Sequence, residues 1–254
     1  MAVAIAARNA GASDFGGDGN GTVTSGELSR ALVVAGEKVK DQFGFGLLGD
    51  VDIYSTPPLL LAGETDDSTS QERVTKYRTA VEGVAALAQK VADDVDSAKG
   101  QDAGTTSPDD AFNALAEDAS DGKVDGSVNG GSVSTFDGVA EADLQTSVET
   151  DPATLDIPGS DGTTVSEVKD IVQSETSSTG NDDADTSSVD STDTTTESAK
   201  SAPDFDGDGT PDAEDTDDDD DGTPDTSDAF PLDPSETIDT DDDGIGNNAD
   251  TDDD

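Results

Sequence analysis

No lysine, arginine or histidine occurs after Lys200, and the stretch from Asp204 to Asp254 is dominated by aspartate. Carboxylates at this density repel one another and leave little apolar surface to bury, a composition that normally favours disorder. The whole chain shares the bias, since its 254 residues carry a net charge of −49 and only 30% are hydrophobic. A defined fold therefore requires molar salt, at which the Debye length falls to about 3 Å, or bound cations.

The first of these solutions agrees with the overall composition. The chain is rich in acids, Ala, Val, Thr and Gly and poor in lysine, and in this respect it resembles proteins of salt-accumulating halophilic archaea. The resemblance implies an acidic, halophilic protein. Adaptation to salt alone predicts acids scattered over a surface, however, and not acids at a fixed spacing.

The residue types that are missing exclude several classes of function. The chain has no cysteine and no histidine, which removes disulfides, thiolate chemistry, the usual zinc ligands and the usual general base. The charge excludes a basic nucleic-acid footprint. No run of 18 apolar residues predicts a membrane span, and the N-terminus lacks the basic region of a secretory signal. Without nucleotide-binding glycines or an aromatic-lined cleft, we expect no enzyme and no catalytic or cofactor-binding residues.

Composition divides the chain into four regions. Residues 1–100 have most of the helical pattern and predict a small helical head, and residues 101–173 are mixed, with short helices, short strands and turns. Residues 174–203 are low in complexity and rich in Ser, Thr and Asp, so we expect a linker or stalk that buries nothing. Residues 204–254 form an acidic repeat. The expected fold class is mostly α, with an irregular module at the C-terminal end.

Helix starts are marked by capping signals. Thr24 with Glu27 and Thr164 with Glu167 have capping-box spacing, as do Thr69 and Glu72, and Ser107 precedes a proline at a first helical position. Within a helix expected over residues 70–98, apolar residues recur in steps of three and four, a heptad seam. The seam has two interpretations, packing inside one domain or a self-associating coiled coil, and consists of Val74, Tyr77, Val81, Val84, Ala88, Val91 and Val95.

The aspartates of the acidic repeat follow the pattern D-x-D-x-D-G-x-x-D/N-x-x-D, and successive copies are offset by 13, 22 and 13 residues. The candidate metal ligands are Asp204, Asp206, Asp208, Asp212 and Asp215 in the first copy, Asp217, Asp219, Asp221, Asp225 and Asp228 in the second, Asp239, Asp241, Asp243, Asn247 and Asp250 in the third, and Asp252 at the start of a fourth.

This spacing suits calcium. Ca²⁺ takes six to eight oxygens at about 2.3–2.6 Å, and carboxylates at alternate positions of a tight loop can converge on one ion. The glycine after the third aspartate allows the sharp turn. The ninth and twelfth positions can complete the shell or bridge to the next ion. Mg²⁺ demands stricter octahedral geometry, so calcium is the better candidate and several ions are expected.

Residues 204–254, and especially DAFPLDPSETIDTDDDGIGNNADTDDD, resemble the thrombospondin type 3 repeats of prokaryotic surface proteins. The resemblance covers about a fifth of the chain. It implies a module with little hydrophobic core, wrapped around a row of calcium ions. The vertebrate repeats also carry disulfides, which this chain lacks, so the ions and the apolar group Phe230, Pro231 and Leu232 are the remaining staples.

The glycine-rich loop near the N-terminus resembles an EF-hand loop. With Gly21 at the sixth position, the ligand positions contain Asp18, Asn20, Thr22 and Glu27, but Gly16 stands where the first carboxylate belongs. The alternative is a glycine-rich turn before a capped helix. Asn20 also begins an Asn-Gly-Thr glycosylation sequon, and a metal ligand and a glycan acceptor are exclusive uses of one side chain.

A helical head, a linker and a calcium-stabilised end favour a structural protein without enzymatic activity. Calcium at the concentration that such repeats need suggests the outside of a cell, whereas no export signal is apparent. Assembly into a virion meets both conditions, so we expect a component of a haloarchaeal virus, such as a capsid turret, a decoration protein or a tail fibre. Expected partners are further copies of the chain and other virion or surface-layer proteins. The alternatives are a haloarchaeal cell-surface or secreted adhesion protein and a soluble calcium buffer.

Overall fold

The computed structural model describes residues 1–12, 15–17, 19–49, 51–121, 123–128, 130–181, 184, 186, 196–199, 215–240 and 246–248. The chain is mainly helical, as predicted. Its α-helices are α1 (Ala2–Asn9), α2 (Ser25–Phe43), α3 (Ser68–Ala98), α4 (Pro108–Asp118), α5 (Glu141–Val148), α6 (Val168–Ser174) and α7 (Thr176–Thr179). Short 3₁₀ turns are η2 (Ala119–Asp121), η3 (Ser134–Phe136), η4 (Pro152–Thr154), η5 (Val165–Glu167) and η8 (Asp225–Ser227).

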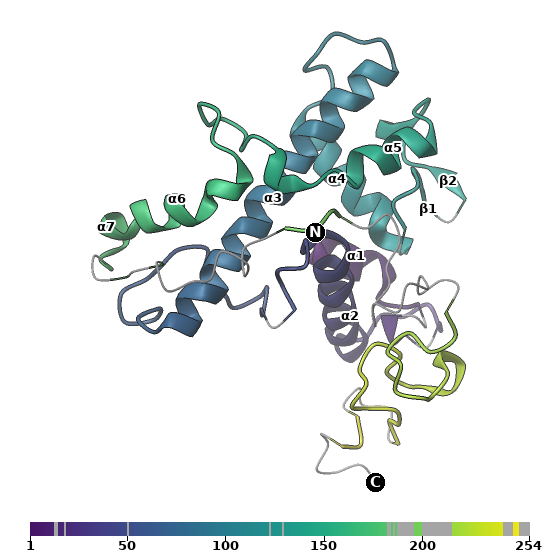
Figure 1. The fold of residues 1–254 in the computed structure, drawn as a ribbon. Helices are drawn as coiled ribbons and strands as arrows, with labels where there is room; N and C mark the ends of the chain where they lie inside the picture. Colours follow the sequence, from purple (N-terminus) through teal and green to yellow (C-terminus); the bar gives the residue numbers. More distant parts are fainter. Residues whose placement is uncertain are drawn as a thin grey trace.

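The longest helix, α3, runs through the middle of the molecule (Figure 1). It packs on α4, α5 and α6, and α1 packs on α2. The described strands β1 (Ser127–Val128) and β2 (Gly131–Ser132) form one antiparallel hairpin, in which Ser127 lies opposite Ser132. The mixed region 101–173 thus wraps around the helix that the head supplies.

The predicted caps explain where several helices begin. Thr24 and Glu27 form a complete capping box at α2, and Thr164 and Glu167 form another at the start of η5. Ser107 caps α4 with Pro108 as the first helical residue. The prediction for α3 was wrong by two residues, because Asp67 is the N-cap and accepts a hydrogen bond from the Ser70 backbone N–H at 2.9 Å. Carboxylates are good N-caps, and Asp67 comes first along the chain.

The heptad seam of α3 is largely buried inside the chain. Val74, Ala88, Val91 and Val95 are each at most 2% exposed, whereas Val81 is 41% exposed. The arrangement agrees with the first interpretation of the seam, packing within one domain.

Two apolar clusters meet α3 at different points. The larger includes Ile5, Phe43, Phe45, Leu87, Val91, Val95, Leu115 and Phe136, and the smaller includes Leu60, Val74, Val165, Val168 and Val172. Phe45 reaches α3 at Gly83, where an added Cβ would lie 2.7 Å from the ring. A side chain at that position would therefore displace a ring that forms part of the core.

The segment predicted to be a linker that buries nothing differs from that expectation in its described residues. It contains the end of α6 and all of α7, and Ala184 and Ala199 are at most 5% exposed. Glu197 donates its backbone N–H to the Phe45 carbonyl at 2.9 Å, and Thr196 donates its hydroxyl to Asp151 Oδ1 at 2.8 Å. Alanine and threonine are small enough to dock in this way once their polar groups find partners.

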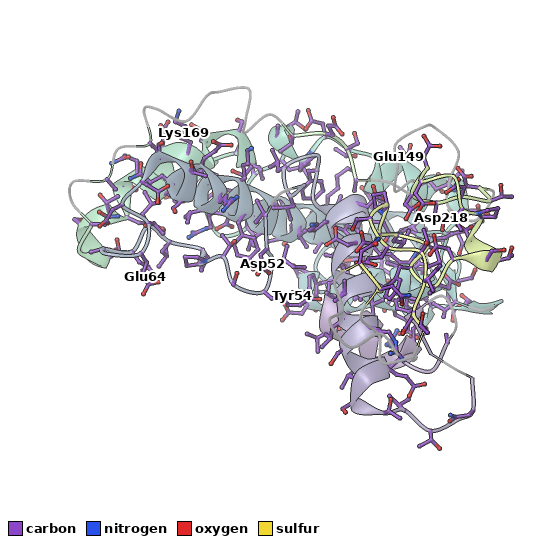
Figure 2. All side chains as sticks on the ribbon, turned by 90° about the horizontal axis from the view of Figure 1, so that it is seen from below. Asp52, Tyr54, Glu64, Glu149, Lys169 and Asp218 are labelled. Atoms are coloured by element: carbon purple, nitrogen blue, oxygen red, sulfur yellow. The ribbon has the colours of Figure 1, made fainter. Side chains whose placement is uncertain are left out.

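The acidic surface that the composition predicts covers several parts of the molecule. Glu64, Glu149 and Asp218 lie on separate segments (Figure 2), and the first two are exposed. Residues 215–240 of the acidic repeat lie at one end of the molecule, away from α6 and α7 (Figure 1).

Candidate metal centre

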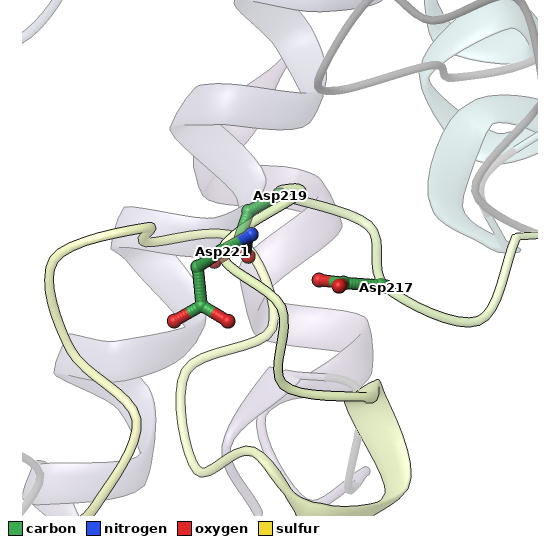
Figure 3. A group of neighbouring side chains, drawn as sticks. All are labelled: Asp217, Asp219 and Asp221. Carbon is green, nitrogen blue, oxygen red and sulfur yellow. Dashed lines mark hydrogen bonds between the residues drawn. The ribbon is translucent and has the colours of Figure 1, made fainter.

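Three aspartates of the second repeat copy converge on one point. Asp217, Asp219 and Asp221 each present a carboxylate oxygen, and these oxygens all lie within 4.8 Å of one another (Figure 3). They are the first, third and fifth residues of the D-x-D-x-D-G pattern. The aspartates that alternate along the sequence therefore bring their carboxylates close together in the folded loop.

The backbone between these aspartates turns sharply. Asp220 and Gly222 both have positive φ angles, 53° and 94°, which glycine adopts freely and Asp tolerates better than most residues. Within the turn, Asp219 Oδ1 accepts from the Asp221 N–H at 3.2 Å and Asp221 Oδ1 accepts from the Thr223 N–H at 2.7 Å. Short-range bonds of this kind fold a polar loop without any apolar core.

Several aspartates of this loop have one carboxylate oxygen that accepts no hydrogen bond. Asp217 Oδ1, Asp219 Oδ2 and Asp228 Oδ2 are buried and have no hydrogen-bond partner in the described structure, whereas the second oxygen of each accepts a backbone N–H. A buried, unpaired acceptor costs about 1–3 kcal/mol, and more when it is charged. The loop thus orients one set of oxygens with its own amides and leaves another set free for a ligand.

Two of the free oxygens, those of Asp219 and Asp228, belong to carboxyl groups that resist ionisation. Burial raises the pKa of Asp219, which is only 7% exposed, to about 6, and the negative charge of Asp221 adds to this effect. Burial also raises the pKa of Asp228, and the charges of Asp221 and Asp225 act in the same direction. Negative charges crowded together without a positive partner are stabilised by a cation.

The donor set fits a hard cation. Every candidate donor is oxygen, which suits calcium or magnesium and not a softer transition metal. The three carboxylates come from an irregular loop. Asp228, which follows the η8 turn, is near enough for its charge to raise the pKa of Asp219. Calcium accepts such an arrangement more readily than magnesium, because its coordination number and geometry are flexible.

The remaining predicted ligands take other positions. Asp215 Oδ1 accepts from the Thr216 and Asp217 N–H groups, Asp225 Oδ1 from Asp218, and Asn247 Oδ1 from Thr240. Asp239 is half-buried. The candidates that lie outside the described residues are Asp18, Asp204, Asp206, Asp208, Asp212, Asp241, Asp243, Asp250 and Asp252.

The loop that resembles an EF-hand has the contacts of a helix start. Glu27, 2% exposed, accepts the Thr24 N–H at 2.6 Å and so closes the capping box. Asn20 Oδ1 accepts the Thr22 N–H at 2.8 Å, and both residues are exposed. These contacts match the alternative of a glycine-rich turn before a capped helix.

Sequence reasoning missed several buried acids, among them Asp96, which is 1% exposed, Glu236 and Asp118. Glu236 is 6% exposed and its Oε2 accepts the Asn248 N–H at 2.9 Å. A Cβ at Gly246 would lie 2.1 Å from the same oxygen, so Glu236 fills space that glycine leaves open. Asp118, at the end of α4, is fully buried. None of these acids is at an aspartate position of the repeat pattern, and nothing local in the sequence distinguishes them from the exposed acids.

None of the helices in the described part of the chain is long and apolar enough to cross a membrane. No protein-family model, no curated protein and no solved structure gives a significant match to this chain.

Proposed function

We propose that this protein is a calcium-binding structural protein, and that the loop from Asp217 to Asp228 holds one ion. The observation that carries the proposal is the set of buried oxygens without a partner on Asp217, Asp219 and Asp228. Backbone carbonyls and water would complete a shell of six to eight oxygens.

The ion would replace a hydrophobic core. Among the described residues of the module, 215–240 and 246–248, no apolar side chain is buried, since Phe230, Pro231 and Leu232 are half-buried and Ile238 is 57% exposed. A ligand that binds only the folded form stabilises that form by mass action. Calcium would thereby rigidify the C-terminal end, as the resemblance to thrombospondin type 3 repeats implies.

Calorimetric titration of the full-length protein in molar KCl tests the proposal. We expect the wild-type chain to bind calcium more tightly than magnesium, and Asp219→Asn to lose one ion. Asp220→Asn is the matched control, because it removes the same charge from an exposed residue of the same loop. Asp220 has a positive φ, which Asn also tolerates. No calcium binding by the wild type, or equal binding by the two variants, contradicts the proposed site.

Small-angle scattering supplies a second measurement. Removal of calcium by a chelator should expand the C-terminal end, because its carboxylates then repel one another without a bridging ion. An unchanged scattering profile would contradict a structural role for the ion.

As the setting of this protein we propose a virion of a haloarchaeal virus, with the cell surface as the alternative. The acid-rich composition and the proposed calcium module support a protein exposed to a salty, calcium-containing medium. Mass spectrometry of purified particles and of isolated cell envelopes distinguishes the two, because the chain should be enriched in one fraction only.

A further inference from the structure

Asp225 forms hydrogen bonds with the backbone of the residues on both sides of Asp217. Its own N–H donates to the Thr216 carbonyl at 3.0 Å, and its Oδ1 accepts from the Asp218 N–H at 2.9 Å. Asp217, the first aspartate of its repeat copy, therefore lies between the two peptide groups that Asp225 bonds.

The third repeat copy repeats this arrangement 22 residues later. The Asn247 N–H donates to the Ile238 carbonyl at 2.9 Å, and Asn247 Oδ1 accepts from the Thr240 N–H at 2.9 Å. Asp239, the first aspartate of that copy, again lies between the two bonded residues. The second and third repeat copies thus have the same pair of hydrogen bonds, although the side chains that flank the first aspartate differ between them.

We propose that the ninth residue of each copy, Asp225 or Asn247, is a positioning residue for the first carboxylate and not a metal ligand. This inference rests on the proposed function of the module and changes the role that the repeat pattern alone suggested for these two residues. The ninth residue closes the loop by clamping the backbone around the first one, and so orients Asp217 toward Asp219 and Asp221.

The chemistry of the clamp explains the exchange of Asp for Asn. The backbone N–H of Asp218 or Thr240 needs one side-chain oxygen as its acceptor. A carboxylate and a carboxamide both provide such an oxygen. The carboxamide has a further use in the third copy, because Asn247 Nδ2 donates to Thr240 Oγ1 at 2.7 Å. A ligand of calcium, in contrast, would lose charge on the change from Asp to Asn.

Calcium titration of the full-length protein with conservative and truncating variants separates the two roles. Asp225→Asn and Asn247→Asp keep the clamp and should bind calcium within about threefold of the wild type. Asp225→Ala removes the clamp and should weaken one site about 10- to 100-fold, the range for residues that orient metal ligands. Asp219→Asn, which alters a proposed ligand, should weaken that site even though the change is conservative. If Asp225→Asn weakens binding as much as Asp219→Asn does, Asp225 is a ligand and the inference is wrong.

Amide hydrogen exchange provides a readout that does not depend on the metal. The Asp218 amide should exchange slowly in the wild type and in Asp225→Asn, and faster in Asp225→Ala, with calcium or with a chelator. Equal exchange in all three contradicts the clamp even if calcium binds. Protection that follows this pattern while the wild type binds no calcium supports the clamp and contradicts the proposed function instead.

Discussion

The backbone N–H of Gly222 donates to Asp217 Oδ2 at 3.0 Å. The glycine that ends the D-x-D-x-D-G pattern is thereby bonded to the aspartate that begins it. The bond uses one oxygen of Asp217 and leaves Oδ1 free. The turn glycine thus serves two purposes, a positive φ and an amide that orients the first carboxylate.

Gly222→Ala should weaken calcium binding at this loop. A Cβ at this position meets nothing within 4 Å, so its effect comes from the φ of 94°. Such a conformation costs an L-residue about 1–2 kcal/mol, which corresponds to a loss in affinity of roughly five- to thirtyfold. Calorimetric titration measures it. Gly49→Ala, at an exposed glycine with open space and no positive φ, should leave affinity unchanged, and an equal effect of both would exclude backbone strain as the cause.

Glu27→Gln distinguishes the capping box from an EF-hand site. Glutamine can take the place of glutamate in a capping box, so we expect the stability of the head and the number of bound calcium ions to stay the same. Thr24→Ala should instead lower the free energy of unfolding by about 1 kcal/mol, with or without calcium. Thermal unfolding and calorimetry provide both quantities. Loss of one ion in Glu27→Gln would restore the calcium interpretation of this loop.

Val91→Ala should destabilise the head by about 2 kcal/mol, because it removes buried methyl groups from a position that is 0% exposed and leaves a cavity. Val81→Ala, on the same seam but 41% exposed, should change the free energy of unfolding by less than about 0.5 kcal/mol. Chemical denaturation measures both. If the seam joins two copies of the chain, Val81→Ala should also shift the oligomeric state in light scattering; within one domain it should not.

Asp118 makes the stability of the fold depend on pH. Burial raises its pKa to about 7, against hydrogen bonds to both oxygens from the Gly126 N–H, and the charge of Asp125 adds to the rise. Its place at the C-terminus of α4 is also unfavourable for a negative charge. Because the folded state holds the proton more tightly than the unfolded state, stability should be lost as the pH rises from about 4 to 7.

Asp118→Asn should remove this penalty. At about 1.4 kcal/mol for each pKa unit, the variant should be a few kcal/mol more stable than the wild type at pH 8 and nearly equal to it at pH 4. Melting temperatures by circular dichroism at constant molar salt measure the difference. Asp161→Asn removes the same charge at an exposed position and should show no such trend; a gain from Asp118→Asn that does not vary with pH would contradict ionisation as its cause.

Several local features of this structure could be predicted from the sequence. The caps at Thr24, Ser107 and Thr164 could be predicted because a cap and its amide lie within three residues of each other. The same holds for the turn at Gly222 and for the alternation of Asp217, Asp219 and Asp221, whose carboxylates meet through bonds that span a few residues. Asp67 shows the limit of such patterns, since Asp67 and Thr69 are both residue types that can cap α3 and local spacing does not decide between them.

The sequence by itself determined the helical character of the chain, the caps at Thr24, Ser107 and Thr164, and the acidic turn, because each depends on neighbours along the chain. Only the tertiary structure decided which acids are buried, how Asp225 spans Asp217, and that Ala184 and Ala199 dock on the helices instead of lying in a free linker. These outcomes depend on which surfaces meet, and a buried carboxylate such as Asp118 or Glu236 has the same local sequence character as an exposed one.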